Sequence, residues 1–226
     1  MRAEAQRPRR IWPWLVGVAS IVIALLIVIV VTSQRPTGPP ASSPTSSPAQ
    51  SPSASGNDVE PTGCLGGQSR DANMVLAAGT SAPHTSNGAI EVATAFVRWL
   101  NQYPYPTAAD IAAVEKVALS GSAPTKDIGA FFDSKPNLSG GLVPDQSPYY
   151  LSTVPGVFHL ESAATDEVTA SIGSALVVDG ALSPTLKGSI TVTVAWESGG
   201  WKFVSSEGTR TTEDLYSIGL PFTAGC

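Results

Sequence analysis

Two histidines and a group of tyrosines are the side chains of this sequence best suited to catalysis. His84 lies in a polar segment before a predicted helix, and His159 alternates with Phe158 and Leu160 in a predicted strand. Neither histidine has a partner nearby in the sequence at the spacing of a metal site or a catalytic triad. The motifs of serine hydrolases, zinc proteases and phosphate-binding loops do not occur. The sequence therefore predicts no enzyme, no metal site and no cofactor, with both histidines solvent-facing or hydrogen-bonded.

Four tyrosines stand beside prolines or in predicted loops: Tyr103, Tyr105, Tyr149 and Tyr150. An aromatic ring with a polar tip in such a place either covers a core or contacts a partner. The four tyrosines are therefore candidates for contact with a partner or ligand, with core covering and catalysis as the alternatives.

The segments that position these residues begin with an apolar run near the N-terminus. Four arginines precede Ile11–Val31, a run of 21 residues without a charge. At ~1.5 Å per helical residue this run spans roughly 32 Å, which is close to the thickness of a bilayer core. A cleaved secretory signal has an apolar core of about 7–15 residues and a small-residue cleavage site, which Thr32–Pro36 does not provide. The run predicts an uncleaved anchor, with a cleaved signal as the alternative. Basic flanks stay in the cytoplasm, so residues 1–10 are predicted inside and the C-terminal part outside.

Residues 32–57 have the composition of a linker. They are rich in Ser, Pro, Thr, Ala and Gly and contain no large apolar residue. Such a segment cannot bury enough surface to offset the entropy of ordering, so we predict disorder with polyproline character. At ~3.1 Å per residue its reach is on the order of 75 Å. The linker either lifts the outer domain through a wall layer or only decouples the domain from the anchor.

The remaining residues, 58–226, are predicted to form one extracytoplasmic domain. They carry 8 Lys and Arg residues against 17 Asp and Glu residues, a net charge of −9. Nucleic-acid binding needs clustered basic residues, so this acidic domain argues against a nucleic-acid partner. Cys64 and Cys226 lie at the two ends of the domain, and outside the cytoplasm they predict a disulfide, with two free thiols as the alternative.

Hydrophobic periodicity predicts helices first and strands afterwards. The helical segments are Ser86–Asn101, a second helix beginning at Thr107, and Thr125–Asp133. The predicted strands are Val157–Ala163, Glu167–Val178, Gly188–Glu197 and Trp201–Ser206. This order indicates an α+β fold with helices packed on a curved antiparallel sheet.

Two stretches give this domain a resemblance to known proteins. Ile90–Leu100 with its following short helices, and Ser189–Phe203 with its Gly-Gly turn and Trp-Lys pair, resemble the cone-shaped fold named after nuclear transport factor 2. Pro83–Ala89 is similar to the first-helix entry of actinobacterial membrane proteins associated with mobile elements. A basic anchor, a linker and one such domain resemble the anchored bridging subunits of type IV secretion and conjugation systems of Gram-positive bacteria. The resemblance implies a cone-like domain and a role in conjugation or secretion.

The sequence as a whole predicts a single-pass cell-membrane protein with its N-terminus in the cytoplasm and its C-terminal domain outside. Its expected role is a non-enzymatic scaffold or accessory subunit of a cell-envelope complex, with other envelope proteins, and a second copy of the chain, as partners. Two alternatives remain. One is a ligand-binding module that holds a lipid, a wall fragment or a small solute in a cone pocket. The other is an isomerase- or hydrolase-type enzyme. The cone fold that the domain resembles can hold a pocket in which a carboxylate, here Asp133 or Asp145, acts beside one of the four tyrosines.

Overall fold

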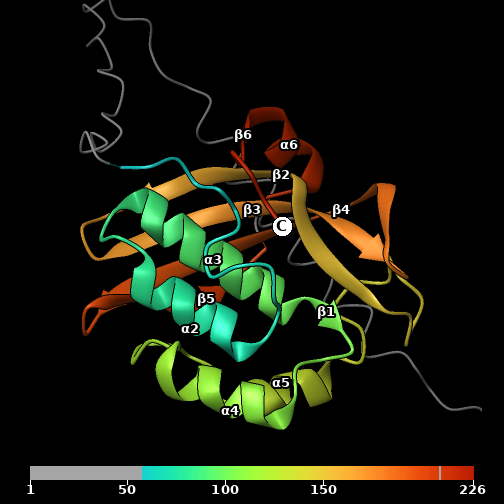
Figure 1. Cartoon of the computed structure of the whole chain (residues 1–226), viewed down its shortest axis with the longest axis horizontal. Coiled ribbons are helices and arrows are strands. Elements are labelled where there is room, and N and C mark those ends of the chain that lie inside the picture. Colours follow the sequence, from blue (N-terminus) through green and yellow to red (C-terminus); the bar gives the residue numbers. More distant parts are fainter. Residues whose placement is uncertain (1–57, 209) are drawn as a thin grey trace, which may run out of the picture. The chain divides into compact units, whose positions relative to one another are not determined.

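The computed structural model describes residues 58–208 and 210–226, which fold as an α+β domain (Figure 1). The predicted cytoplasmic tail (1–10), anchor (11–31) and linker (32–57) lie outside the described residues. Within the described part, none of the helices has the length and apolar character needed to cross a membrane.

The domain has five helices and six strands in the described residues. The helices are α2 (Ala72–Ser81), α3 (Ser86–Leu100), α4 (Ala108–Val117), α5 (Ile128–Ser134) and α6 (Thr212–Ile218). The strands are β1 (Gln102–Tyr103), β2 (Tyr149–Ala163), β3 (Glu167–Val178), β4 (Ala181–Glu197), β5 (Gly200–Ser206) and β6 (Leu220–Pro221).

The strands form one curled antiparallel sheet in the order β1-β2-β3-β4-β5, and β6 pairs with β2 (Figure 1). Register shifts interrupt β2 between Ser152 and Gly156 and between Leu160 and Ser162. Extra residues of this kind bend a strand and increase its twist, so they account for the curl. The predicted α+β class with a curved antiparallel sheet is therefore confirmed.

Helix α3 is the centre of the core. It lies across the inner face of the sheet, with α2 beside it (Figure 1). Every residue from Gly88 to Leu100 is buried, and the Trp99 side chain is fully enclosed. The sequence predicted a helix with one apolar face, but its polar face is also buried, because α2 and the segment that precedes α2 cover it. A helix enclosed on all sides is typical of the interior of a larger core.

The opposite, outer face of the sheet carries α6. A Cβ added at Gly173 of β3 would meet Leu215 and Tyr216 of α6. The neighbouring residue, Ile172, points to the inner face and belongs to the main core. Since successive side chains of a strand point to opposite faces, α3 and α6 lie on opposite sides of the sheet.

The predicted elements are found, but two helices and parts of two strands were not predicted. Helices α2 and α6 had no sequence prediction. Strand β2 begins at Tyr149 and β4 at Ala181, earlier than the predicted Val157 and Gly188. Prolines explain the short predictions, since Pro155 lies within β2 and Pro184 within β4. Proline is tolerated at bulges and sheet edges, and β2 has a register shift around Pro155.

A buried carboxylate fixes the chain where it enters the domain. Glu91 of α3 is 7% exposed. Its Oε1 accepts hydrogen bonds from the backbone N–H and hydroxyl of Thr62, at 2.5 and 2.6 Å. Its Oε2 accepts from the N–H of Gly63 at 3.1 Å and of Leu65 at 3.5 Å. A buried charge needs such partners, so Glu91 and the entry segment Thr62–Leu65 depend on each other.

A buried cation on the same helix holds the next part of the entry segment. Arg98 is fully buried, and its Nη2 donates to the carbonyl oxygen of Gly67 at 3.1 Å. Burial, together with the nearby Arg70 charge, lowers the pKa of the Arg98 guanidinium to about 10. Arg98 therefore remains charged at neutral pH and keeps this bond to the chain.

The two cysteines meet at the entry segment. The structure brings Cys64 and Cys226 to disulfide-bonding distance, with their Cα atoms 5.3 Å apart and 162 positions apart in sequence. The backbone N–H of Cys226 donates to the Thr153 hydroxyl at 2.8 Å, and that hydroxyl donates to the carbonyl of Gly63 at 3.1 Å. This placement agrees with the predicted bridge and fastens the C-terminus to the beginning of the domain.

We expect the double variant Cys64→Ser/Cys226→Ser to lower the free energy of unfolding by about 2–5 kcal/mol, because the unfolded chain then gains the freedom that the closed loop removes. Thermal unfolding followed by tryptophan fluorescence measures the change. A reducing agent should destabilise the native protein and leave the variant unchanged. A native protein that unfolds identically with and without the reducing agent would contradict the bridge.

We also expect Glu91→Gln to destabilise the domain by about 2–4 kcal/mol, because the amide has one oxygen to accept bonds and presents an NH₂ group to the N–H donors. Glu167→Gln is the matched control, since Glu167 is exposed. Hydrogen exchange should show faster exchange at Thr62, Gly63 and Leu65 in the Glu91 variant alone. Unchanged exchange there would refute the role assigned to Glu91.

Candidate functional site

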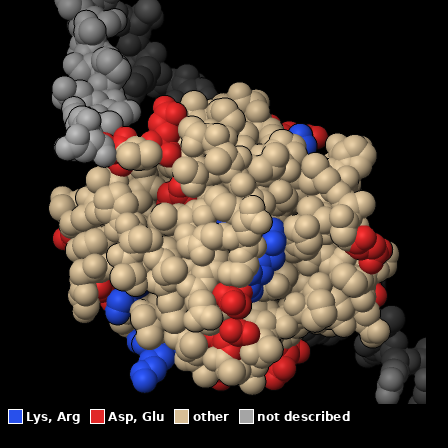
Figure 2. Space-filling view, viewed as in Figure 1, with Lys and Arg blue, Asp and Glu red and all other residues tan. Residues whose placement is uncertain are grey.

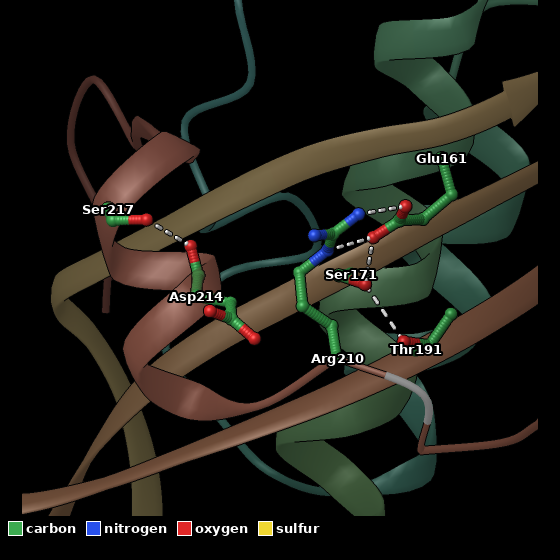
Figure 3. Close-up of polar contacts among 6 residues, drawn as sticks. All are labelled: Glu161, Ser171, Thr191, Arg210, Asp214 and Ser217. Carbon is green, nitrogen blue, oxygen red and sulfur yellow. Dashed lines mark hydrogen bonds and ion pairs between the residues drawn. The ribbon is translucent and has the colours of Figure 1, made fainter.

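A chain of polar side chains crosses the outer face of the sheet (Figure 3). Thr191 of β4 and Ser171 of β3 share a hydrogen bond of 2.8 Å. The Ser171 hydroxyl donates to Oε1 of Glu161 in β2 at 2.6 Å. The Arg210 guanidinium binds both Glu161 oxygens, through Nε at 2.6 Å and Nη2 at 2.5 Å. Three neighbouring strands and the segment before α6 are joined in this way.

The electrostatics of this chain suit a structural clamp. The hydrogen bond from Arg210 is the largest cause that lowers the pKa of Glu161 to about 2, and the bond from Ser171 adds to it. A carboxylate with so low a pKa is a poor general base at neutral pH. Ser171, the one nucleophile that it contacts, has no exposed surface. The arrangement therefore resembles a nucleophile–base pair only in connectivity.

Other polar groups lie near this chain of polar side chains but are not hydrogen-bonded to it. Asp214 and Ser217 belong to α6, where the Ser217 hydroxyl donates to the backbone carbonyl of Asp214 at 2.7 Å (Figure 3). The Asp214 side chain accepts from the hydroxyl of Thr211 at 2.7 Å and completes the helix cap. His159 is the register partner of Ser171 and shares its face of the sheet. It therefore points away from Phe158, as the alternation predicted.

His84 lies on an aromatic cluster at the β4–β5 hairpin. Its ring stacks on Trp196 with centroids 4.1 Å apart and meets the edge of Trp201 at 5.5 Å. Its Nε2 lies 2.9 Å from the carbonyl of Thr165 and 3.0 Å from Oδ1 of Asp166, so Nε2–H donates to these acceptors. This is the hydrogen-bonded histidine that the sequence predicted.

The structure brings together three of the four candidate tyrosines. Tyr103 is the register partner of Tyr149, and its ring meets the edge of Tyr105 at 5.6 Å. The Tyr105 hydroxyl donates to the carbonyl of Lys135 at 2.6 Å. Tyr150 lies apart from this group, since Arg70 stacks on its ring at 3.9 Å.

The two acids proposed as partners of these tyrosines do not form a catalytic pair with them. Asp133 and Asp145 are both exposed, and Asp145 accepts a 2.7 Å hydrogen bond from Asn137. An isomerase-type site needs a carboxylate and a tyrosine that converge in a sheltered cavity. The described residues around Tyr149 do not provide that acid.

A cavity of about 290 Å³ lies beside Tyr149, between the loop Leu138–Leu142 and strand β4. Its walls include Leu151, Leu176 and Ile190 from the inner face of the sheet. Two further hollows of about 430 and 260 Å³ flank the stacked rings of Phe96 and Phe203. Of these three cavities, the one beside Tyr149 is lined by a candidate residue that the sequence predicted.

Comparison with protein-family models, curated proteins and solved structures finds no match. The described residues also contain no group of three or more His, Cys, Asp and Glu side chains that could hold a metal ion. The face shown in Figure 2 is mostly uncharged, with a few separate acidic and basic side chains. The geometry of the chain itself is therefore the basis for any functional argument.

Sequence reasoning did not find Glu161, Arg210 or Thr191, because each comes from a different segment and no local motif connects them. Glu91 and Arg98 were also missed. A signal for these two was present, since both are charged residues within an otherwise apolar helical segment. A charge in such a place indicates a buried partner, and the partners here are mainly backbone groups of the entry segment.

The low pKa of Glu161 predicts a specific loss of stability in acid. The ordinary pKa of the group is 4.5 and the folded-state value is about 2. Between these pH values the unfolded chain binds more protons, so the free energy of unfolding falls as the pH drops through this window. Glu161→Gln should lower stability at pH 7 and lose less of it between pH 5 and pH 2.5 than the native protein.

Urea unfolding at a series of pH values tests this expectation. Glu167→Gln is again the control and should keep the native pH dependence, since Glu167 is exposed. If the free energy of unfolding changes with pH in the same way for the Glu161 variant and the native protein, the ion pair with Arg210 does not lower the pKa of Glu161.

Proposed function

We propose that this chain is a single-pass cell-membrane protein whose outer domain is a scaffold or accessory subunit of a cell-envelope complex. Conjugation and secretion machines are the class of complex that its organisation fits best. The basic N-terminus, the uncharged run Ile11–Val31 and the linker 32–57 support the anchored arrangement. The domain that follows is then the working part, on the outer side of the membrane.

The observation that carries this proposal is that the first segment of the domain is bound to the central helix and to Cys226. The chain leaves the linker region at about residue 58. By Thr62 it is bound to the central helix through Glu91, and at Cys64 it meets Cys226. A pull on the linker would therefore act on the best-packed helix of the domain rather than on a peripheral strand. A tethered structural subunit needs this kind of attachment.

We further propose that the domain has a cone-like arrangement, as in the fold named after nuclear transport factor 2 that its sequence resembles. The curled sheet with α3 across its inner face supports it. The enzyme alternative gains no such support. Ser171 is enclosed, and the acids near the tyrosines are exposed. A scaffold role requires neither a nucleophile nor a base.

Photo-crosslinking in cells tests the function. A photoreactive amino acid placed at the exposed positions Val117, Leu182 or Leu220 samples different parts of the domain surface. We expect at least one position to capture membrane or extracytoplasmic proteins of the envelope, identified by mass spectrometry. A variant with Ile11–Val31 deleted should lose this capture. Crosslinks to cytoplasmic proteins alone, or none from any position, would overturn the proposal.

Cysteine labelling controls for the orientation. Ala3→Cys and Ser53→Cys lie on either side of the predicted anchor. A membrane-impermeant maleimide should label the Ser53 variant in intact cells and the Ala3 variant only after permeabilisation. The reverse pattern would place the domain in the cytoplasm.

A further inference from the structure

The cavity beside Tyr149 has an open side on the sheet. Gly188 of β4 lines it, and a Cβ added at Gly188 would meet no atom within 4 Å. Gly188 shares the inner face with Ile190, because the two are separated by one residue in the same strand. The space above Gly188 is therefore part of the cavity and is not filled by a neighbouring side chain.

Three hydroxyl groups in or beside the lining, those of Tyr149, Ser174 and Ser189, are buried without a hydrogen-bond partner among the described residues. The Tyr149 side chain lines the cavity, its residue is 4% exposed, and its Oη is unpaired. Ser174 lies directly across from Gly188 in the register of β3 and β4, is 1% exposed, and also has an unpaired Oγ. Buried hydroxyl groups in native proteins nearly always have a partner, so such exceptions need an explanation.

The walls combine aliphatic and polar side chains. Five are aliphatic, namely Leu138, Leu142, Leu151, Leu176 and Ile190, and the hydroxyl residues Ser139, Ser189 and Thr212 lie among them. Asn101 also lines the cavity, but its side-chain NH₂ already donates to the carbonyl of Val97 at 3.0 Å. These walls favour an aliphatic body over a strongly polar one.

The charge around the cavity argues for a neutral occupant. Lys187 is the one charged residue in its lining, and its Nζ lies 4.2 Å from the centre of the Tyr216 ring on α6. Its ammonium group is thus engaged on the outer-face helix. An ionised ligand inside the cavity would lose its hydration without an ion pair in return. Burial also raises the pKa of Tyr149, so its hydroxyl keeps its proton and acts as a donor.

We propose that this cavity binds a small, neutral, largely aliphatic molecule with one carbonyl or ether oxygen, and that the Tyr149 hydroxyl donates a hydrogen bond to that oxygen. The volume of about 290 Å³ lies just below the range of roughly 300–1,000 Å³ for drug-sized ligands, so the molecule is compact. The site is independent of the scaffold role and adds a second activity to the outer domain.

Ligand-observed ¹⁹F NMR with the full chain in lipid nanodiscs tests the site, with the signal from empty nanodiscs subtracted. Three probes share one ring and differ in their polar group: 4-(trifluoromethyl)cyclohexanone, (trifluoromethyl)cyclohexane and 4-(trifluoromethyl)cyclohexanecarboxylate. The ketone should bind most tightly, because it alone combines a neutral body with an acceptor oxygen. Tighter binding of the carboxylate, or equal binding of the probe without oxygen, would overturn the assigned class.

Variants locate the binding. A Cβ at Gly188 meets open space and valine suits a strand, so Gly188→Val should fill the open side and abolish binding of the ketone. Gly208→Val is the matched control, since Gly208 is exposed, has open space around it and lies outside the cavity lining. Ketone binding that survives in the Gly188 variant as in the Gly208 variant would place the ligand elsewhere and refute the site.

Tyr149→Phe removes the donor and keeps the ring. The loss of one hydrogen bond should weaken the ketone about 2–10-fold and leave the probe without oxygen unchanged. Equal affinity of the ketone for this variant and the native protein would contradict the role of Tyr149. Near-ultraviolet circular dichroism checks that each variant is folded. If the Tyr149 variant is not folded, the probe series on the native protein and the Gly188 variant decide the question.

Discussion

The Glu91 carboxylate, accepting hydrogen bonds from the backbone of the domain entry, is the interaction on which the rest of the structure depends. It places a negative charge inside the core, where such a charge persists only if it is satisfied. The entry segment therefore has to follow a fixed path over α3. That path carries Cys64 to Cys226 and carries the carbonyl of Gly67 to Arg98. Helix α3 is thus the centre of the apolar core, and it also holds the first segment of the domain through hydrogen bonds.

The two faces of the sheet are stabilised by different kinds of interaction. The inner face packs apolar side chains such as Ile172 and Val192 beneath α3. The outer face holds α6 with the polar chain from Thr191 to Arg210, whose members are joined by short hydrogen bonds and one ion pair. The apolar face gains most of its stability from burial. The outer face also depends on the ionised Glu161, so the attachment of α6 is one acid-sensitive part of the domain.

The sequence predicted the fold class, three helices, and the cores of four strands, because these follow from local periodicity. It missed α6 although Thr211 and Asp214 repeat the capping pair, Thr107 and Asp110, that helped to predict α4. Helix α6 is short, and its apolar pattern is too brief to read alone. The candidate sites were harder to predict. Tyr149 was singled out from its type and place, but the cavity beside it depends on Gly188 lying at the right register, and no local pattern encodes that.

The meeting of Cys64 and Cys226 makes nearly all of the domain one closed covalent loop. A single proteolytic cut within that loop, for example in the segment 135–148 between α5 and β2, would leave both pieces joined. The pieces would also still be attached to whatever holds the N-terminal side of Cys64. Damage to an exposed segment would then be local, because the two pieces of the domain would stay covalently linked.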